Sequence, residues 1–346
     1  MCVIAEKKIF CEAVKVRHLV STARKMVNST EGENVTVMKT LLSANIHVGF
    51  YIAIAAVNIV LSIMASLGNI LILIALRKAP SIHPPTKLLF QCLAITDLGV
   101  GLISQPLMGA NFLAVYIKNL DFKIWNISLY PLLWSSSIIF SGVSGFASTA
   151  LSVDRLLALF LGLRYRHVVT LKRIRAVLAC GCLAVLLIML FWTFRPKTAR
   201  IIITICLTLC LIISLFSYTK IVLKLRQHQS SVRDNVQQRR TNAGGIPLNL
   251  DRYKRIVVSI ALVQQALVIC YFPFLIFHIV THLKDIHPGH YLLWYFHTST
   301  LIFLNSSLNP FLYCWRIKEI RQAVKATITG LCACLSRGTS TLSTNQ

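Results

Sequence analysis

Acidic side chains are scarce in this chain of 346 residues, which has 11 Asp and Glu against 36 Lys and Arg. Charged residues make up only 14% of the sequence, whereas a soluble domain carries about 25%. The apolar fraction is 55% and the mean hydropathy is +0.67. A chain that is so short of charge and so rich in apolar residues exposes much of its surface to lipid. The composition therefore predicts a membrane protein and argues against a soluble enzyme.

Several other features are missing as well. The net charge of +25 is not concentrated in a basic domain, because the basic residues lie in short segments between apolar runs. We therefore expect contacts with lipid headgroups and no nucleic-acid partner. The 11 cysteines include no CxxC and no Cys/His metal-ligand spacing, so neither a zinc site nor a disulfide scaffold is expected. No signal-peptide hydrophobic region lies near Met1.

Apolar runs long enough to cross a membrane as helices are abundant. The seven runs lie at about 48–76, 86–113, 127–160, 174–194, 198–225, 254–282 and 290–314. Pro196 and the basic residues on either side of it divide the fourth run from the fifth. The sequence thus predicts an all-α membrane protein with a seven-transmembrane-helix bundle. The expected organisation is an N-terminal tail at 1–47, the bundle at 48–315, an eighth helix at 316–329 and a tail at 330–346.

The eighth helix is expected to be amphipathic and to lie in the membrane interface, with membrane lipid as its partner. Ile317, Ile320, Val324 and Ile328 share one helical face, and charged residues occupy the other. Cys332 and Cys334 follow directly and are candidates for palmitoylation. Two ordinary tail cysteines remain the alternative interpretation.

Basic residues in the loops predict the orientation of the chain. The odd-numbered loops and the C-terminal tail hold most of the Lys and Arg, so they are expected to be cytoplasmic and the N-terminus extracellular. The glycosylation sequons at Asn28, Asn34 and Asn126 all fall on the extracellular side of this scheme. We therefore expect a glycoprotein of the plasma membrane.

Polar residues inside the apolar runs are few and occur in a recognisable order. The only acids are Asp97, in "LAITDLG" of the second run, and Asp154, in "DRL" at the end of the third. A charge at such a depth is costly and points to function. Asn69 lies in "LGNILIL" of the first run, and the seventh contains "NSSLNPFLY". Together these four motifs, in the right helices and order, resemble those of the rhodopsin-like G-protein-coupled receptors.

The resemblance implies a signalling role for the cytoplasmic end and no enzymatic activity. Arg155 would engage a heterotrimeric G protein, and Asp154 would hold that arginine in the resting state. In the active state Arg155 would turn toward Tyr218 and Tyr313. Asn309 and Pro310 would form part of the same switch. Arrestin and a receptor kinase would be further partners. Tyr253 replaces the acid that restrains the arginine in many relatives, which implies measurable agonist-free signalling.

Departures from the family pattern narrow the ligand class. Phe303 stands where an opsin has its retinal lysine, and Ser137 where amine receptors have their aspartate. A short second extracellular loop without a disulfide resembles the melanocortin, cannabinoid and lysophospholipid receptor branch. Leu107, Tyr130 and Trp134 occupy the positions of the calcium-binding acids of melanocortin receptors.

The pocket that the resemblance implies is apolar with a few polar groups, which suits a neutral or lipid-like ligand. The expected ligand-binding residues are Met108, Trp134, Ser137, Ile138, Ser141, Tyr271, Phe274, Leu275, His278, Tyr295 and Ser299. For His278, a structural hydrogen bond is the alternative to a ligand contact.

The resemblance also implies an allosteric sodium ion and no other cofactor. The expected oxygen ligands of this ion are Asp97, Ser144, Asn305, Ser306 and Asn309. Asn69 is expected in the same polar ring around the Asp97 carboxylate. The alternative is a protonated Asp97 that bonds to Asn309 and water.

Other classes remain open at this stage. A transporter would need broken helices or a repeat in the two halves, and neither is evident in the sequence. A receptor-like protein that binds without signalling remains an alternative because the usual tryptophans of helices 4 and 6 and the proline of helix 5 are missing.

Overall fold

The computed structural model describes residues 48–80, 82–117, 130–240, 250–284, 288–316 and 318–343. Side chains are not described in some helical stretches, the longest being 228–240, 250–265 and 331–343. The N-terminal tail, all three sequons and the palmitoylation candidates Cys332 and Cys334 therefore lie outside the residues whose side chains can be discussed.

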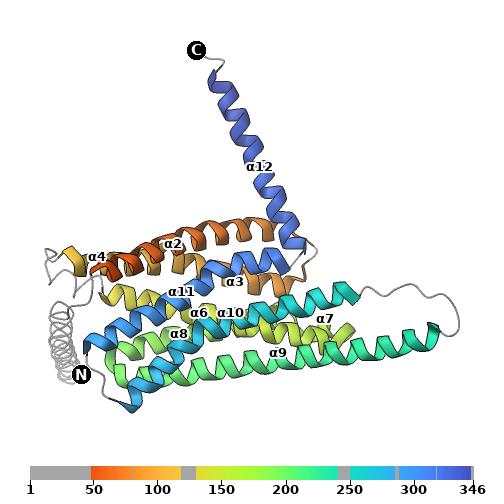
Figure 1. Cartoon of the computed structure of the whole chain (residues 1–346), viewed down its shortest axis with the longest axis horizontal. Coiled ribbons are helices and arrows are strands. Elements are labelled where there is room, and N and C mark those ends of the chain that lie inside the picture. Colours follow the sequence, from red (N-terminus) through yellow and green to blue (C-terminus); the bar gives the residue numbers. More distant parts are fainter. Residues whose placement is uncertain are drawn as a thin grey trace, which may run out of the picture.

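The long helices up to Arg316 run side by side in one bundle, and the last helix leaves this bundle at a steep angle (Figure 1). The first, third and fourth are α2 (Val48–Arg77), α6 (Tyr130–Leu161) and α8 (Leu171–Phe194). The second consists of α3 (Pro84–Gly99), the π-helix η1 (Val100–Ser104) and α4 (Gln105–Ile117). The last three are α9 (Pro196–Arg240), α10 (Leu250–Leu283) and α11 (Pro288–Arg316). Helix α12 (Lys318–Ser343) follows.

Among the described residues, six helices are long and apolar enough to cross a membrane, and α11 is not one of them. The polar residues that lower its hydropathy point into the bundle. Ser307, for example, donates to the Leu61 carbonyl oxygen at 2.9 Å, and Asn58 of α2 donates to Thr300 at 3.1 Å. Helix α11 thus satisfies its polar groups on its neighbours while it keeps the place of a seventh membrane helix.

The break between the fourth and fifth helices lies where it was predicted. Only Arg195, with φ −141° and ψ 69°, separates α8 from α9. Pro196 begins α9, a position that a proline tolerates because the first turn needs no amide donor. The second extracellular loop of the predicted scheme is therefore reduced to a single residue, which leaves the mouth of the bundle without a lid from this loop.

Two helices run further than the sequence analysis expected. Helix α9 continues past 225 to Arg240, because the hydrophobicity criterion stops at the membrane boundary whereas Gln- and Arg-rich sequence remains helical in water. Helix α12 continues past 329 to Ser343. Ile320 of α12 is fully buried against Ile72, Leu76 and Tyr313, which fixes the start of this helix to α2 and α11.

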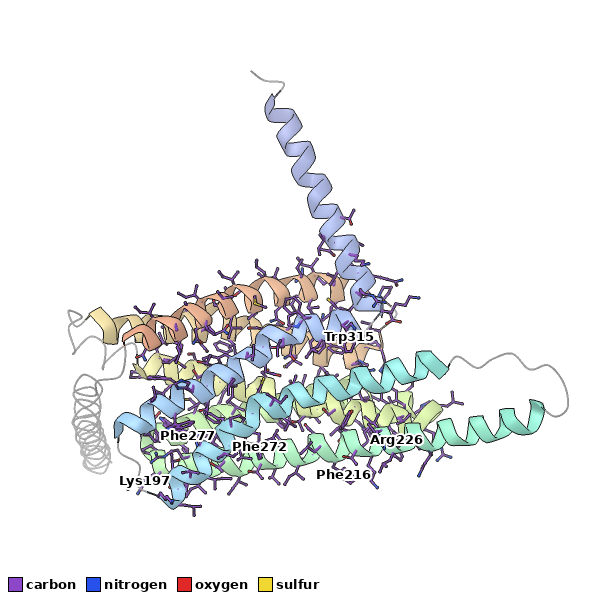
Figure 2. All side chains as sticks on the ribbon, in the orientation of Figure 1. Lys197, Phe216, Arg226, Phe272, Phe277 and Trp315 are labelled. Carbon is purple, nitrogen blue, oxygen red and sulfur yellow. The ribbon has the colours of Figure 1, made fainter. Side chains whose placement is uncertain are left out.

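Figure 2 labels residues near the two ends of the bundle. Lys197 and Phe277 lie near one end, here called the Lys197 end. Arg226 and Trp315 lie toward the other, here called the Trp315 end. The bundle has two separate buried clusters, one around Trp134 and Tyr295 and one around Phe90 and Tyr313.

Candidate functional site: three linked clusters in the bundle

Asp97 lies at the centre of the polar interior of the bundle. It is fully buried and accepts three hydrogen bonds. The hydroxyls of Ser144 and Ser306 donate to Oδ1 at 2.7 and 2.8 Å, and the amide of Asn309 donates to Oδ2 at 2.7 Å. Helices α3, α6 and α11 therefore meet at one carboxylate, as the sequence analysis expected for these three donors.

Two further asparagines of the expected ring occupy different places. Asn305 is buried but is not among the described donors to Asp97, and its Nδ2 has no described partner. Asn69 donates to the backbone oxygens of Ala65 and Ser306 at 2.8 and 3.2 Å. It therefore reaches the Asp97 cluster through Ser306.

The position of Asn69 follows from the proline of α11. Pro310 has no amide hydrogen, so the carbonyl of Ser306, four residues earlier, loses its helical partner. Asn69 supplies the missing donor from α2. Gly68 makes the approach possible, because a Cβ there would lie 2.8 Å from Pro310 Cγ.

At the Trp315 end, Asp154 is buried and well supplied with donors. Tyr165 donates to Oδ1 at 2.6 Å and Thr86 to Oδ2 at 2.9 Å. Tyr165 begins the short helix α7 (Tyr165–Val168), which follows the 3-10 turn Gly162–Arg164. The acid therefore ties α3 and the α6–α8 connection together. Neither Thr86 nor Tyr165 was predicted, because each is a common residue at a helix end and only the fold brings both to Asp154.

Arg155 pairs with Asp154 loosely, with Nε 3.7 Å from Oδ2 and 34% of the arginine side chain exposed. Its guanidinium carbon lies 5.8 Å from the centre of the Phe90 ring. Phe90 in turn makes an edge-on contact with Tyr313 at 5.0 Å. Phe90 therefore links Arg155 to the tyrosine of the NPxxY motif, a link that sequence reasoning missed.

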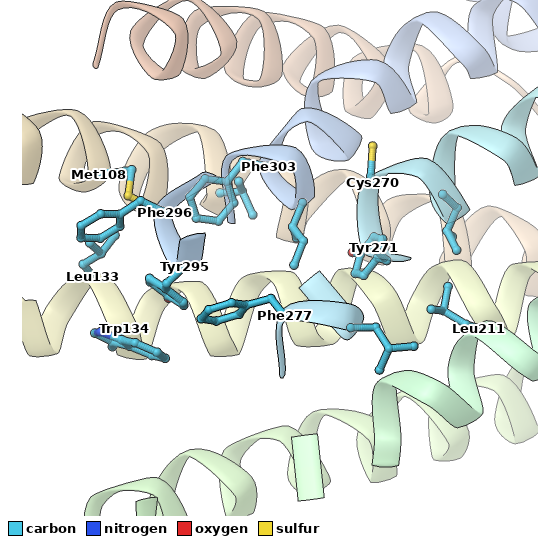
Figure 3. Packing of buried hydrophobic residues seen from close by; sticks show 14 of the residues in the cluster. Met108, Leu133, Trp134, Leu211, Cys270, Tyr271, Phe277, Tyr295, Phe296 and Phe303 are labelled. Atoms are coloured by element: carbon cyan, nitrogen blue, oxygen red, sulfur yellow. The ribbon is translucent and has the colours of Figure 1, made fainter. Parts of the chain in front are cut away.

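Aromatic rings fill the interior at the Lys197 end (Figure 3). Trp134 of α6 stacks on Tyr295 of α11 at 4.1 Å and on Trp192 of α8 at 4.7 Å. Trp192 was not predicted, because the periodicity of one helix does not tell which neighbour a ring will meet. The stack closes the space between three helices.

The residues of the predicted pocket come together around this stack. Met108, Trp134, Tyr271, Leu275 and Tyr295 belong to one buried cluster, and Ile138 and Phe274 pack against it. Ser137, His278 and Ser299 are also buried. Tyr271, which replaces the usual tryptophan of helix 6, packs against Gly145, with its hydroxyl 3.4 Å from where a Cβ would lie.

Several buried polar atoms in this region have no hydrogen-bond partner within the described part of the chain. They comprise both ring nitrogens of His278, the hydroxyls of Ser137 and Ser141, and both side-chain polar atoms of Gln105. Gln105 begins α4 directly after the π-helix, and its backbone N–H donates to the Val100 carbonyl oxygen five residues back. Most buried polar atoms in proteins are paired, with protein or with water. A group of them among aromatic rings therefore marks a place where a polar molecule can bind.

Comparison with known proteins agrees with this arrangement. The family model described as "7 transmembrane receptor (rhodopsin family)" matches residues 68–206 and 192–313. Melanocortin receptor 4 of Danio rerio is 23% identical over 285 residues, which cover 79% of this chain and 82% of that protein. The two family matches overlap at the junction of α8 and α9. Since the family model covers more than half of the chain, the protein belongs to the rhodopsin family of seven-transmembrane receptors.

Proposed function

We propose that the protein is a plasma-membrane receptor that binds a small ligand at the Lys197 end and activates a heterotrimeric G protein at the Trp315 end. The observation that carries the proposal is the group of unpartnered polar atoms of His278, Ser137 and Ser141 among aromatic rings. An apolar site with sparse polar groups is the usual form of a small-molecule site. Family membership decides against the transporter and against an enzyme.

The Lys197 end is the extracellular one in this proposal. Basic residues flank the opposite end more heavily, as the positive-inside rule requires for the cytoplasmic side. Lys78, Lys172, Arg173, Arg175 and Lys224 all lie at the Trp315 end and are described as exposed. The three sequons then lie outside the cell, and the N-terminal tail is expected to carry glycans.

The signal would travel along the polar interior. A ligand among the rings contacts α6, α10 and α11, the helices that carry Ser141, His278 and Tyr295. A shift of α6 or α11 must change the bonds of Asp97, because Ser144 lies on the former and Asn309 on the latter. Four residues beyond Asn309, Tyr313 contacts Phe90, which lies under Arg155. Ligand and G-protein sites thus bias the same packed set of helices.

Sodium at Asp97 is a second part of the proposal. The residues present fit the ion, because the carboxylate has the Ser144 and Ser306 hydroxyl oxygens within 2.8 Å and hard cations prefer oxygen ligands. The buried Asn69 Oδ1 has no described partner and is a further oxygen near this cluster. A protonated Asp97 held by the same three donors is the alternative, and the response to sodium separates the two.

In this proposal, the similarity to melanocortin receptor 4 is not used to infer the ligand. Leu107 and Trp134 stand where melanocortin receptors carry calcium-binding acids, and Trp134 is already stacked between two rings. A compact apolar or amphiphilic ligand fits this interior better. Arrestin, a receptor kinase and membrane lipid along α12 are proposed as further partners.

Agonist-free G-protein activation tests the proposal without knowledge of the ligand. Membranes with graded amounts of the receptor would be combined with each of the main classes of purified G protein, and nucleotide exchange would be measured. We expect exchange to rise with receptor amount for at least one class. No exchange at any expression level, followed by none with any compound in a ligand library, would identify a receptor that binds without signalling.

A further inference from the structure

Basic side chains gather around the ends of α8, α9 and α10 at the Lys197 end. Arg195, Lys197, His282 and Lys284 are exposed there, and Arg200 is half-buried one turn into α9. The acids whose side chains the structure describes are Asp97, Asp154 and Glu319, and all three lie elsewhere: in mid-bundle, at the Trp315 end and on α12. Within the described residues, this rim therefore has positive charge without a counterion.

Arg200 brings this charge to the edge of the aromatic interior. Its guanidinium carbon lies 5.9 Å from the centre of the Tyr291 ring, and its Nε is buried with no hydrogen-bond partner among the described residues. His278 of α10 is 1% exposed, and neither of its ring nitrogens has a hydrogen-bond partner among the described residues. Phe277 contacts both the Tyr291 ring, beside which Arg200 lies, and the His278 ring, so the guanidinium and the imidazole belong to one group of side chains. Within the described residues, the Arg200 Nε and the His278 ring nitrogens have no hydrogen-bond partner in this group. The flat donor fork of an arginine matches the oxygens of a carboxylate or phosphate.

An apolar wall adjoins these donors. Phe274 and Phe277 lie 4.4 and 5.6 Å from His278, ring centre to ring centre, and Phe277 lies 5.1 Å from Tyr291. A small inorganic anion could bind only the polar groups of this site, and a wholly apolar molecule would leave the Arg200 Nε and the His278 ring nitrogens without a hydrogen-bond partner. The site is therefore suited to a molecule with an acidic group at one end and an apolar body.

We propose that the ligand of this receptor is an anionic amphiphile whose carboxylate or phosphate group binds Arg200 and His278 and whose apolar body packs on the rings of α10 and α11. The proposal rests on the receptor function proposed above and narrows its compact apolar or amphiphilic ligand to an anionic amphiphile, in place of the neutral ligand expected from the sequence. Anionic membrane lipids are concentrated in the cytoplasmic leaflet, on the side of the membrane opposite to Arg200 in the proposed orientation. The basic rim would attract the ligand from outside the cell.

Thermal unfolding of the full-length receptor in phosphatidylcholine nanodiscs, followed by tryptophan fluorescence, tests this. The probes are decanoate, decyl phosphate, methyl decanoate and inorganic phosphate. We expect decanoate or decyl phosphate to raise the midpoint in a saturable manner, and methyl decanoate and inorganic phosphate to bind at least tenfold more weakly. The acid and its ester differ only in charge and one methyl group, so wild-type protein alone already decides whether the charge matters.

Variants then locate the charge. Arg200→Gln should weaken binding of the acidic amphiphile at least tenfold, Arg200→Lys should weaken it less, and the exposed control Lys197→Gln should leave it within about twofold. Equal binding of acid and ester, undiminished binding by Arg200→Gln, or no response of a cooperatively unfolding receptor to either acid would overturn the proposal. Because these are binding measurements, failure of G-protein activation leaves them unchanged, and the two proposals can fail separately.

Discussion

Arg155, at the Trp315 end of α6, is only loosely held by its neighbours. The ion pair with Asp154 is long for a charge-assisted hydrogen bond, at 3.7 Å, and a third of the arginine side chain is exposed. Asp154 makes shorter hydrogen bonds with Thr86 and Tyr165, and these two residues hold the carboxylate in place. Arg155 can therefore leave Asp154 at little cost, while the acid itself stays fixed.

Replacement of this arginine should abolish signalling and spare the fold. In Arg155→Ala we expect the loss of G-protein activation, measured as nucleotide exchange, with surface expression close to that of the unmodified receptor. The physical reason is that a partly exposed side chain contributes little to stability while its charge is available to a partner. Arg175→Ala, at an exposed position on α8, is the control and should signal normally. Undiminished nucleotide exchange in Arg155→Ala would show that the arginine only anchors α6 at the membrane interface.

Asp97 gives the second prediction at this scale. Sodium chloride should raise the thermal unfolding midpoint of the purified receptor relative to an equal concentration of N-methylglucamine chloride. An ion present at about ten times its Kd contributes about 1.4 kcal/mol to stability, since it binds only the folded state. Asp97→Asn should remove this difference, because the carboxylate is the charged ligand.

The matched control is Asp154→Asn, which alters the other buried acid of the described bundle. It should lower the unfolding midpoint yet keep the sodium increment. The same midpoint in both salts for the unmodified receptor would favour a protonated Asp97 held by Asn309.

At the scale of elements, Asp154 connects α3, α6 and α7 through two donors. Tyr165→Phe removes the 2.6 Å bond and leaves a buried carboxylate with fewer donors. Hydrogen bonds to charged groups contribute about 1.5–3 kcal/mol, and we expect a loss of stability in that range, measured by thermal unfolding.

Thr86→Val should have a smaller effect on its own, because its bond to Asp154 is longer, at 2.9 Å against 2.6 Å for Tyr165. The double variant should differ from the sum of the two single effects, since Thr86 and Tyr165 bond to the same carboxylate and to each other at 3.1 Å. Strict additivity would show that the two donors do not form a network.

The topology of the whole molecule carries the last prediction. A receptor made in glycosylating cells should lose mass on glycosidase treatment, and Asn28→Gln combined with Asn34→Gln should reduce or remove this shift. An antibody to the C-terminal tail should stain only permeabilised cells. The reason is the excess of Lys and Arg at the Trp315 end. Staining of intact cells by that antibody, with no glycan on either asparagine, would reverse the orientation.

Much of the architecture follows from the sequence because lipid offers no hydrogen bonds to the backbone. Apolar runs of sufficient length must be helices, and Pro196 with its basic neighbours must interrupt them. The resemblance to the rhodopsin-like receptors implied that Ser144, Ser306 and Asn309 lie around Asp97, and all three donate to its carboxylate. The end of α9 at Arg240 was not, because hydrophobicity no longer marks a helix once it has left the membrane.

The sequence by itself determined the seven helices, the family and the residues around Asp97, because each depends on motifs or on hydrophobicity along one helix. Only the tertiary structure decided that Asn69 satisfies the carbonyl freed by Pro310, that Tyr165 and Thr86 share Asp154, and that Trp192 joins the stack on Trp134. It also decided that Arg200 meets the aromatic interior at Tyr291. These contacts join different helices, and the rotation of each helix about its axis is set by the packing of all its neighbours, which no single stretch of sequence contains.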